Sequence, residues 1–278
     1  MSVTERQVLH ILPPQPSSDG AGVKLDRYFP VAGIVALDPF LLLDAFGSEA
    51  ATDYIAGFPS HPHRGFETVT YMLAGRMRHR DNAGNEGVLG PGGVQWMTAG
   101  RGIVHEEMPE QEEGEMRGFQ LWVNLPARDK MRAPRYQNIE PEDIPEVHRP
   151  DGTAIRVIAG TVDGVTGAVT EIAVAPVYLD VALPAGLTFR HDLPSAHTAL
   201  VQVFAGSARI GDRPIARGDL ALLGDGDVAA VTAGPEGARF LLIAGQRLNE
   251  PVARYGPFVM NTKEEIMQAI ADFQSGRF

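Results

Sequence analysis

Residues 119 to 125 read Phe-Gln-Leu-Trp-Val-Asn-Leu, and this stretch indicates the class of fold. Its odd-numbered positions are all apolar, whereas the positions between them hold glutamine, tryptophan and asparagine. Side chains on a β-strand point alternately to opposite sides of the sheet. The stretch therefore predicts a strand with two different faces.

Short runs of the same type occur along the whole chain. They lie at residues 69–73, 94–97, 155–158, 179–183, 201–204 and 240–243. The chain also contains 31 glycines and 21 prolines, which separate these runs as turns between short strands would. Many short strands with frequent turns are typical of a β-sandwich or a β-barrel, so we predict an all-β fold.

A weak internal repeat indicates two copies of one barrel. Gly75 is followed by a charged hairpin and then by Gly92, and Gly206 is followed by a shorter hairpin and then by Gly218. The two gaps are 17 and 12 residues, so the second copy lacks five residues in its hairpin. A chain of 278 residues is long enough for two barrels of average size.

The domain boundaries follow from composition. The stretch 138–152 is polar and rich in proline, and we predict that it links a first barrel at residues 1–137 to a second at 153–278. Near the end of the chain, Thr262 and Glu265 form a capping-box pattern ahead of a periodic apolar face. We therefore predict a short C-terminal helix that belongs to the second domain.

Charge and composition exclude several functional classes. The net charge is −11 and Lys and Arg are not clustered, which argues against direct binding of nucleic acid. The chain has no cysteine, so neither a disulfide nor a thiolate metal site can form. We find no apolar run of transmembrane length and no secretory segment, and we expect a cytoplasmic protein without membrane contact.

Two motifs, His61-Pro-His63 and His105-Glu-Glu107, form the candidate metal site. Residues two apart on a strand point to the same side, so each motif presents two ligands to one point. Together they supply three imidazoles and one carboxylate and leave one or two positions open on an octahedral ion. A set of two histidines and one carboxylate with open positions is typical of non-haem iron oxygenases, and this site adds one more histidine, so we expect iron, as Fe2+ or Fe3+. Zinc, copper, nickel and manganese remain alternatives.

Other residues compete for places near the metal. Glu67 lies four residues after His63 and is either a ligand itself or a support that orients an imidazole. We expect Glu107 to ligate and Glu67 to support. Gln95 is a candidate to reach the pocket, and Arg101 either binds an anionic group of a substrate or fixes a tight turn. His79 is expected at the surface.

Two long segments resemble the signature segments of the pirin family, which belongs to the cupin superfamily. They are residues 61–75 (HPHRGFETVTYMLAG) and 91–109 (PGGVQWMTAGRGIVHEEMP). Residues 38–44 (DPFLLLD) and 250–261 (EPVARYGPFVMN) are similar to that family as well. The resemblance spans nearly the whole chain and implies two tandem cupin-type β-barrels, a bicupin.

The resemblance also implies where the metal lies. Pirins hold iron in the N-terminal barrel, and the family's ligand positions fall here on His61, His63, His105 and Glu107. In the second barrel, the internal repeat puts other residue types at the corresponding positions, namely Asp192, Pro194, Val231 and Ala233. We therefore expect a second barrel without metal, whose His191 and His197 lie at the surface or in packing.

Some pirins oxidise the flavonol quercetin with dioxygen, so the resemblance implies a quercetin 2,3-dioxygenase-type activity on a small aromatic substrate. Metal coordination would acidify the substrate hydroxyl, and Glu107 is the expected catalytic proton acceptor. Cleavage of the heterocycle would release carbon monoxide. Phe58, Phe66 and Met97 are expected to form apolar walls of the pocket.

The alternative is a non-catalytic protein in which the oxidation state of the metal tunes a surface that binds a transcription factor or an enzyme. Mammalian pirins act as nuclear co-regulators of transcription. A purely structural metal with closed coordination is a third hypothesis. An enzyme requires an open ligand position that faces a cavity, whereas the two alternatives do not.

Overall fold

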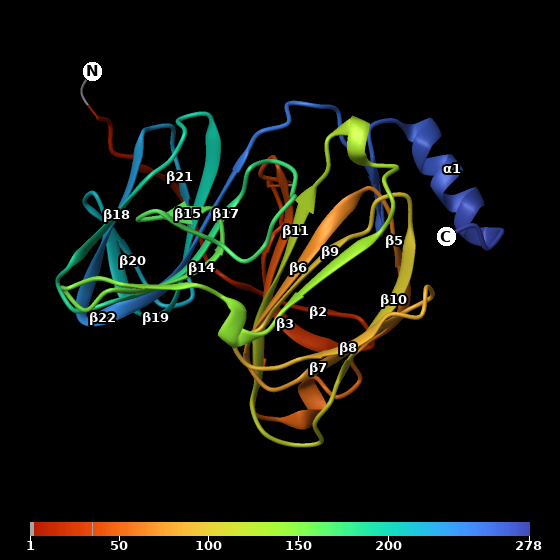
Figure 1. Ribbon diagram of the computed structural model, residues 1–278, viewed down its shortest axis with the longest axis horizontal. Helices are drawn as coiled ribbons and strands as arrows, with labels where there is room; N and C mark the ends of the chain where they lie inside the picture. Colours follow the sequence, from red (N-terminus) through yellow and green to blue (C-terminus); the bar gives the residue numbers. More distant parts are fainter. Residues whose placement is uncertain (1–2, 35) are drawn as a thin grey trace. The chain divides into compact units, whose positions relative to one another are not determined.

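Alternating apolar and polar residues form antiparallel strands along the chain, as the sequence predicts (Figure 1). The computed structural model describes residues 3–34 and 36–278, and within them α1 (Lys263–Gln274) is the one α-helix. The strand predicted at 119–125 lies within β11 (Met116–Asn124), where Phe119, Leu121 and Val123 are buried. The all-β bicupin fold with a short C-terminal helix is confirmed.

The chain divides into two compact units. The first barrel consists of residues 15–141 together with 248–278. Its larger sheet has the strand order β12-β9-β6-β11-β4-β3-β2, its smaller sheet the order β5-β10-β7-β8, and β23 pairs with β24. The bounds are β2 (Gln15–Asp19), β3 (Val23–Phe29), β4 (Phe40–Ser48), β5 (Phe58–His63), β6 (Phe66–Ala74), β7 (Met77–Asp81), β8 (Glu86–Leu89), β9 (Val94–Thr98), β10 (Ile103–Pro109), β12 (Arg135–Ile139), β23 (Ala253–Tyr255) and β24 (Phe258–Met260).

The second barrel consists of residues up to Pro14 together with 142–247. Its main sheet has the order β1-β21-β19-β22-β17-β14-β13, with β18 paired to β22 and β20 to β19, and β15 pairs with β16. The bounds are β1 (Val8–Leu12), β13 (Glu146–His148), β14 (Ala154–Ala159), β15 (Thr161–Val162), β16 (Val165–Thr166), β17 (Val177–Leu183), β18 (Thr188–Asp192), β19 (His197–Ile210), β20 (Arg213–Ile215), β21 (Leu220–Leu223) and β22 (Val228–Gln246). Short 3-10 turns lie at Ala51–Asp53, Ala127–Asp129 and Pro141–Asp143.

Each terminal segment of the chain belongs to the other barrel than predicted. The N-terminal segment belongs to the second barrel, where β1 pairs with β21 and buried Arg6 donates to the carbonyls of Pro194, His197 and Gly224. The C-terminal residues 248–278 belong to the first barrel. The predicted linker 138–152 contains the boundary at 141/142 but also parts of β12 and all of β13. Local composition does not reveal that the terminal segments belong to the other barrel, because the pairing of β1 with β21 joins residues far apart in the sequence.

The internal repeat is visible in the hydrogen bonding. Gly92 donates its N–H to the Met72 carbonyl, and Gly218 donates to the Val203 carbonyl. Both glycines have positive φ angles, 82° and 93°, and each acceptor lies three residues before the first glycine of its repeat. The hairpin that separates the two points is β7–β8 in the first barrel and the shorter turn into β20 in the second. The alignment made from the sequence is therefore confirmed at these positions.

The C-terminal helix forms as predicted but packs on the first barrel. The Thr262 hydroxyl accepts from the Glu265 N–H and the Glu265 carboxylate accepts from the Thr262 N–H, which completes the capping box. Ile266 and Ala269 are buried against β24. On the same unit, Arg64 follows β5 and forms a 2.8 Å ion pair with Asp272 of the helix.

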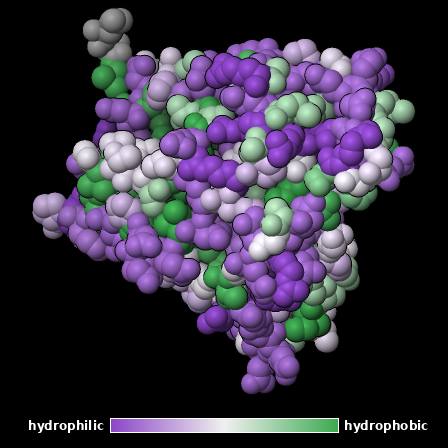
Figure 2. All heavy atoms as spheres, turned by 45° about the vertical axis from the view of Figure 1, so that its right-hand side comes forward, coloured by the Kyte–Doolittle hydropathy of each residue, from purple (hydrophilic) through white to green (hydrophobic). Residues whose placement is uncertain are grey.

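Polar residues make up most of the surface seen in Figure 2. On the face drawn in Figure 2, hydrophilic side chains predominate and hydrophobic ones lie in small separate groups. Among the described residues, the most exposed of the larger apolar side chains are those of Val3, Met267 and Tyr255. Within the described part of the chain, no helix is long and apolar enough to cross a membrane.

Lys130 ties together three segments around the turn between β5 and β6. Its ammonium donates to the Gly65 carbonyl at 2.7 Å, to the Asn124 side chain at 2.6 Å and to the Val259 carbonyl at 3.0 Å. An ammonium has three donors, so each is used. Lys130 is 1% exposed, and burial lowers its pKa to about 8. This contact connects the turn after β5 to β24 near the end of the chain.

Replacement of Lys130 by methionine tests this connection. We expect Lys130→Met to lower the free energy of unfolding by about 3 kcal/mol, because three buried acceptors lose their donor. Urea denaturation measures the change. Arg128→Met is the matched control, since the Arg128 side chain is 83% exposed, and it should change stability by less than about 0.5 kcal/mol. Equal stability of the two variants would contradict the role assigned to Lys130.

Candidate metal centre and cavity

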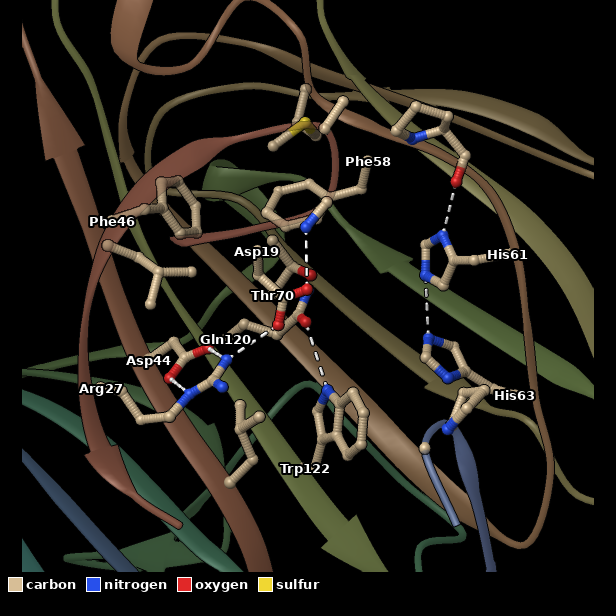
Figure 3. Close-up of a pocket in the computed structure, with 18 of the residues that line it drawn as sticks. Asp19, Arg27, Asp44, Phe46, Phe58, His61, His63, Thr70, Gln120 and Trp122 are labelled. Carbon is tan, nitrogen blue, oxygen red and sulfur yellow. Dashed lines mark hydrogen bonds and ion pairs between the residues drawn. The ribbon is translucent and has the colours of Figure 1, made fainter. Parts of the chain in front are cut away.

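Three histidines converge where β5 and β10 pair. The strands are antiparallel, and His105 lies directly opposite His61 in the register, so both side chains point to one face. His63 follows His61 by two residues on the same strand. The His61 Nε2 atom lies 3.0 Å from the Nε2 atoms of both His63 and His105 (Figure 3 shows the first of these contacts). The strand pairing that the sequence prediction requires is thus present.

This cluster has the donor set and spacing of a metal site. The three histidines each offer one nitrogen, and these nitrogens lie within 4.8 Å of one another. Two imidazole nitrogens about 2.1 Å from one ion, in adjacent coordination positions, would be roughly 3 Å apart, which matches the observed spacing. Burial lowers the pKa of His105 to about 4 and holds the pKa of His63 well below its ordinary value. Both imidazoles are therefore neutral at pH 7 and available as ligands.

Glu107 lies beside the histidines but is held by other side chains. Its Oε2 atom is 4.0 Å from the His105 Nε2 atom. Its carboxylate accepts from the Thr70 hydroxyl at 3.2 Å and from the Gln120 amide at 3.1 Å. The side chain is 5% exposed, whereas Glu106 points the other way and pairs with Arg78. Glu107 thus lies at the edge of the cluster, and these hydrogen bonds fix the orientation of its carboxylate.

A cavity of about 530 Å³ opens beside the cluster. His61 and His63 line it, together with Thr70, Gln120 and Trp122. Figure 3 shows the two histidines on one side of this cavity and the Arg27–Asp44 pair on the other. Its apolar walls come from β3, β4, the start of β5, β7 and β11, and they comprise Leu25, Leu42, Phe46, Phe58, Met77 and Trp122.

A hydrogen-bonded chain joins the cavity wall to Glu107. The Trp122 indole N–H donates to the Gln120 side-chain oxygen at 3.2 Å, and the Gln120 amide nitrogen donates to Glu107. The Trp122 ring also contacts the His63 ring, with centroids 5.2 Å apart. Gln120 therefore uses both ends of its amide, which leaves one orientation for the group.

Two arginines from distant parts of the sequence line the cavity. Arg27 makes two bonds to Asp44, at 2.8 and 2.6 Å, and a third to Asp19 at 2.8 Å. The hydrogen bonds that Arg27 donates to Asp44 raise the pKa of Arg27 above its ordinary value. The guanidinium is therefore charged, and the carboxylate of Asp44 balances its charge. Arg254 lies over the Trp122 ring, 5.0 Å from its centroid, and donates to the Leu41 carbonyl at 3.2 Å.

The three residues proposed as supports of the metal lie in other places. Glu67 pairs in register with Val123 and Thr98, on the opposite face of β6 from Thr70, and accepts from the Thr98 hydroxyl at 2.7 Å. Burial raises the pKa of this carboxyl. The expectation that Glu67 orients an imidazole is wrong, because residues an odd number apart on a strand face opposite sides.

Gln95 and Arg101 lie outside the cavity beside the histidines. Gln95 lies opposite Thr70 and faces the barrel interior as expected, but its amide donates to Asn138 at 3.0 Å and it does not line the cavity described above. Arg101 is exposed, its N–H donates to the Arg132 carbonyl at 2.8 Å, and it borders a separate hollow with Tyr136. The turn interpretation of Arg101 fits this position.

Other side chains also differ in part from expectation. His79 lies opposite Glu107 in the β7–β10 register, is 3% exposed and stacks on Tyr136, so its expected surface position is wrong. Phe58 lines the cavity as expected and Phe66 packs on the His63 ring. Met97 instead packs with Ala99 and Ile103 in a separate apolar cluster.

The second barrel has an apolar interior at the equivalent place. Val231 of β22 lies opposite Phe189 of β18, whereas the alignment of the repeats implies that it lies opposite Asp192, which in fact pairs with Val228. Phe189, Val231 and Ala233 belong to a large buried apolar cluster. His191 stacks on Phe189, and the His197 carbonyl accepts from Arg6. Among the described residues, the three histidines of the first barrel form the one group of three or more His, Cys, Asp or Glu side chains that could hold a metal ion.

Several residues of the site carry weak signals in the sequence. Gln120 is a polar residue beside Trp122 on the face of β11 opposite Phe119, Leu121 and Val123, and a polar group at that place is a local sign of a functional role. The Arg27–Asp44 pair has no such sign, because it depends on the register of β3 against β4. Arg254 lies within the family-like segment 250–261, but its position beside Trp122 follows from the return of the chain to the first barrel.

Comparisons with known proteins agree with this architecture. The pirin family model matches residues 22–123, and the model of the pirin C-terminal cupin domain matches residues 178–278. A pirin-like protein of Caulobacter vibrioides is 53% identical over 98% of this chain and 99% of its own length. Human pirin is 42% identical over 94% of this chain and 89% of its own. A solved structure of quercetin 2,3-dioxygenase from Acinetobacter baumannii is 38% identical, with a TM-score of 0.90 and coverage of 99% and 98%.

Two isosteric variants distinguish the carboxylates as ligands. We expect Glu107→Gln to weaken iron(II) binding by at least about tenfold, because it removes the charge beside the histidines. Glu67→Gln should bind iron as tightly as wild type, since Glu67 lies on the other face of β6. Competition with a chromogenic chelator under anaerobic conditions measures both affinities. Loss of affinity in Glu67→Gln with retention in Glu107→Gln would reverse the assignment.

Proposed function

The chain belongs to the pirin family, and from that premise we propose that it is an iron-dependent dioxygenase of the quercetin 2,3-dioxygenase type. The observation that carries the proposal is the position of the His61 and His63 imidazoles in the wall of a cavity of about 530 Å³. Cavities of this size suit a small organic ligand, and a purely structural metal would not require one. The similarity to a structure named quercetin 2,3-dioxygenase supports a flavonol as substrate.

We propose that His61, His63 and His105 hold the iron through their Nε2 atoms and that Glu107 completes the set. Imidazole and carboxylate donors suit iron, although zinc, copper, nickel and manganese accept similar ligands. When bound, the metal would lower the pKa of a coordinated substrate hydroxyl and make dioxygen reactive toward the substrate. Both oxygen atoms would enter the cleaved product, with carbon monoxide as the second product, so no external reductant is required.

Glu107 is the proposed proton acceptor for the substrate hydroxyl. A carboxylate can take the proton only if one of its oxygens faces the hydroxyl, so its orientation matters. Thr70 and Gln120 hold the carboxylate by hydrogen bonds, and Gln120 is in turn fixed by the Trp122 indole. These three residues therefore act as positioning residues for Glu107.

The apolar walls of the cavity would orient the flat substrate. Phe46, Phe58 and Trp122 offer aromatic faces, and Leu42 adds an aliphatic surface. Rings packed against these side chains would displace water from the space beside the histidines. Exclusion of water protects a reactive intermediate from side reactions and strengthens the electrostatic effect of nearby charges.

Oxygen consumption with quercetin tests the proposal. We expect the anaerobically iron-loaded protein to consume one dioxygen and release one carbon monoxide per quercetin. Iron-saturated Glu107→Gln should show a kcat lower by about 10²-fold to 10⁴-fold, because it lacks the proton acceptor. His61→Ala should lose activity together with iron, whereas Glu67→Gln should retain both.

Absence of turnover despite one iron per chain would contradict the proposal. That outcome would favour the alternative, a regulatory protein in which the oxidation state of the metal tunes a surface for a protein partner. Uptake of dioxygen without release of carbon monoxide would contradict cleavage of the quercetin 2,3-dioxygenase type. That result would instead indicate an oxygenase of another type.

A further inference from the structure

Arg254 differs from Arg27, the other arginine of the cavity, in its partners. Arg27 has three contacts with carboxylate oxygens of Asp19 and Asp44. Around Arg254, none of the described carboxylates lies within ion-pair distance, and the acceptor that it uses is the Leu41 carbonyl. A guanidinium has five N–H donors, so most of the hydrogen-bonding capacity of Arg254 is unused by the described residues.

The surroundings of Arg254 give it a fixed place and a bias toward anions. The Trp122 ring supports one side of the guanidinium at 5.0 Å, and stacking of this kind leaves the edges of the group available. Asp44 and Asp19 are both bonded to Arg27 and do not neutralise Arg254 directly. Burial and the nearby Arg27 lower the pKa of Arg254, whereas Asp44 and Asp19 raise it, and an anionic ligand would offset the repulsion from Arg27.

Arg254 also lies close to the candidate metal centre. The same Trp122 indole that contacts Arg254 contacts the His63 ring at 5.2 Å, so one aromatic side chain separates the guanidinium from the histidines. Both His63 and Arg254 line the cavity. A single bicyclic ligand could therefore meet the histidine cluster and the guanidinium at once.

We propose that Arg254 is a specificity-determining residue that selects substrates carrying an acidic oxygen, such as a carboxylate, in addition to the group that meets the metal. The inference rests on the proposed function in one respect, since it takes the cavity beside the histidines as the substrate site. The ligand class is an aromatic hydroxy compound with one further anionic group. Arginine suits this task because its planar fork binds a carboxylate through two parallel hydrogen bonds.

Binding of matched ligands to the zinc-loaded protein tests the inference without turnover. The probes are 3-hydroxyflavones with one carboxylate on the phenyl ring, as meta and para isomers, and the carboxamide of each. Zinc carries out no redox chemistry, so calorimetry reports affinity alone. We expect at least one carboxylate isomer to bind wild type roughly tenfold or more tightly than its carboxamide.

Variants at Arg254 separate charge recognition from a structural effect. Arg254→Gln should remove the preference for the carboxylate, and Arg254→Lys should retain part of it because the charge remains. Arg101→Gln, which makes the same charge change outside this cavity, should leave the preference intact. Zinc stoichiometry and thermal unfolding equal to wild type would show that the Arg254→Gln variant is folded.

The outcomes separate this inference from the proposed function. Equal affinity of carboxylate and carboxamide for wild type, in both isomers, or an unchanged preference in Arg254→Gln, would overturn the inference even if quercetin is oxidised. Charge-dependent binding that is lost in Arg254→Gln would support it even if no dioxygen is consumed with quercetin.

Discussion

The candidate centre depends on the antiparallel register between β5 and β10. This register sets His61 opposite His105, and the two-residue period of the strand brings His63 to the same face. A slip by one residue would turn His105 away and present Glu106 in its place. The turn after β5 limits such movement, because Gly65 has a φ of 91° and approaches the Val259 carbonyl more closely than any side chain would permit. Lys130 joins the same two residues.

The two barrels show that side chains inside the barrel, and not the fold, decide whether a site exists. Both copies keep the hydrogen bonding around Gly92 and Gly218. In the first barrel, the strands β5 and β10 carry imidazoles toward the interior. In the second, Phe189 and Val231 take the comparable place and belong to an apolar core. The second copy thus retains the scaffold and fills its interior with packing.

Local pattern was sufficient to predict the strands, the capped helix and the histidine cluster. His61, His63 and His105 are recoverable because a strand has a strict period of two and each motif lies on one strand. Glu67 lies on the next strand, β6, where it is three residues before Thr70 and so faces away from the histidines. The spacing within the motif alone does not show this change of face. Arg27, Asp44 and Arg254 depend on strand register and on the return of the chain to the first barrel, which no local pattern contains. The return of the chain also decides on which barrel α1 packs, so the sequence does not predict that it packs on the first.

Anomalous diffraction at the iron edge, from crystals of the iron-loaded protein, tests the central claim most directly. The account predicts one strong peak within about 2.1 Å of the Nε2 atoms of His61, His63 and His105, with at least one coordination position open to the cavity. A peak at another place would contradict the assignment of the centre. An ion at the histidines whose positions are all taken by protein atoms would contradict its role in binding a substrate.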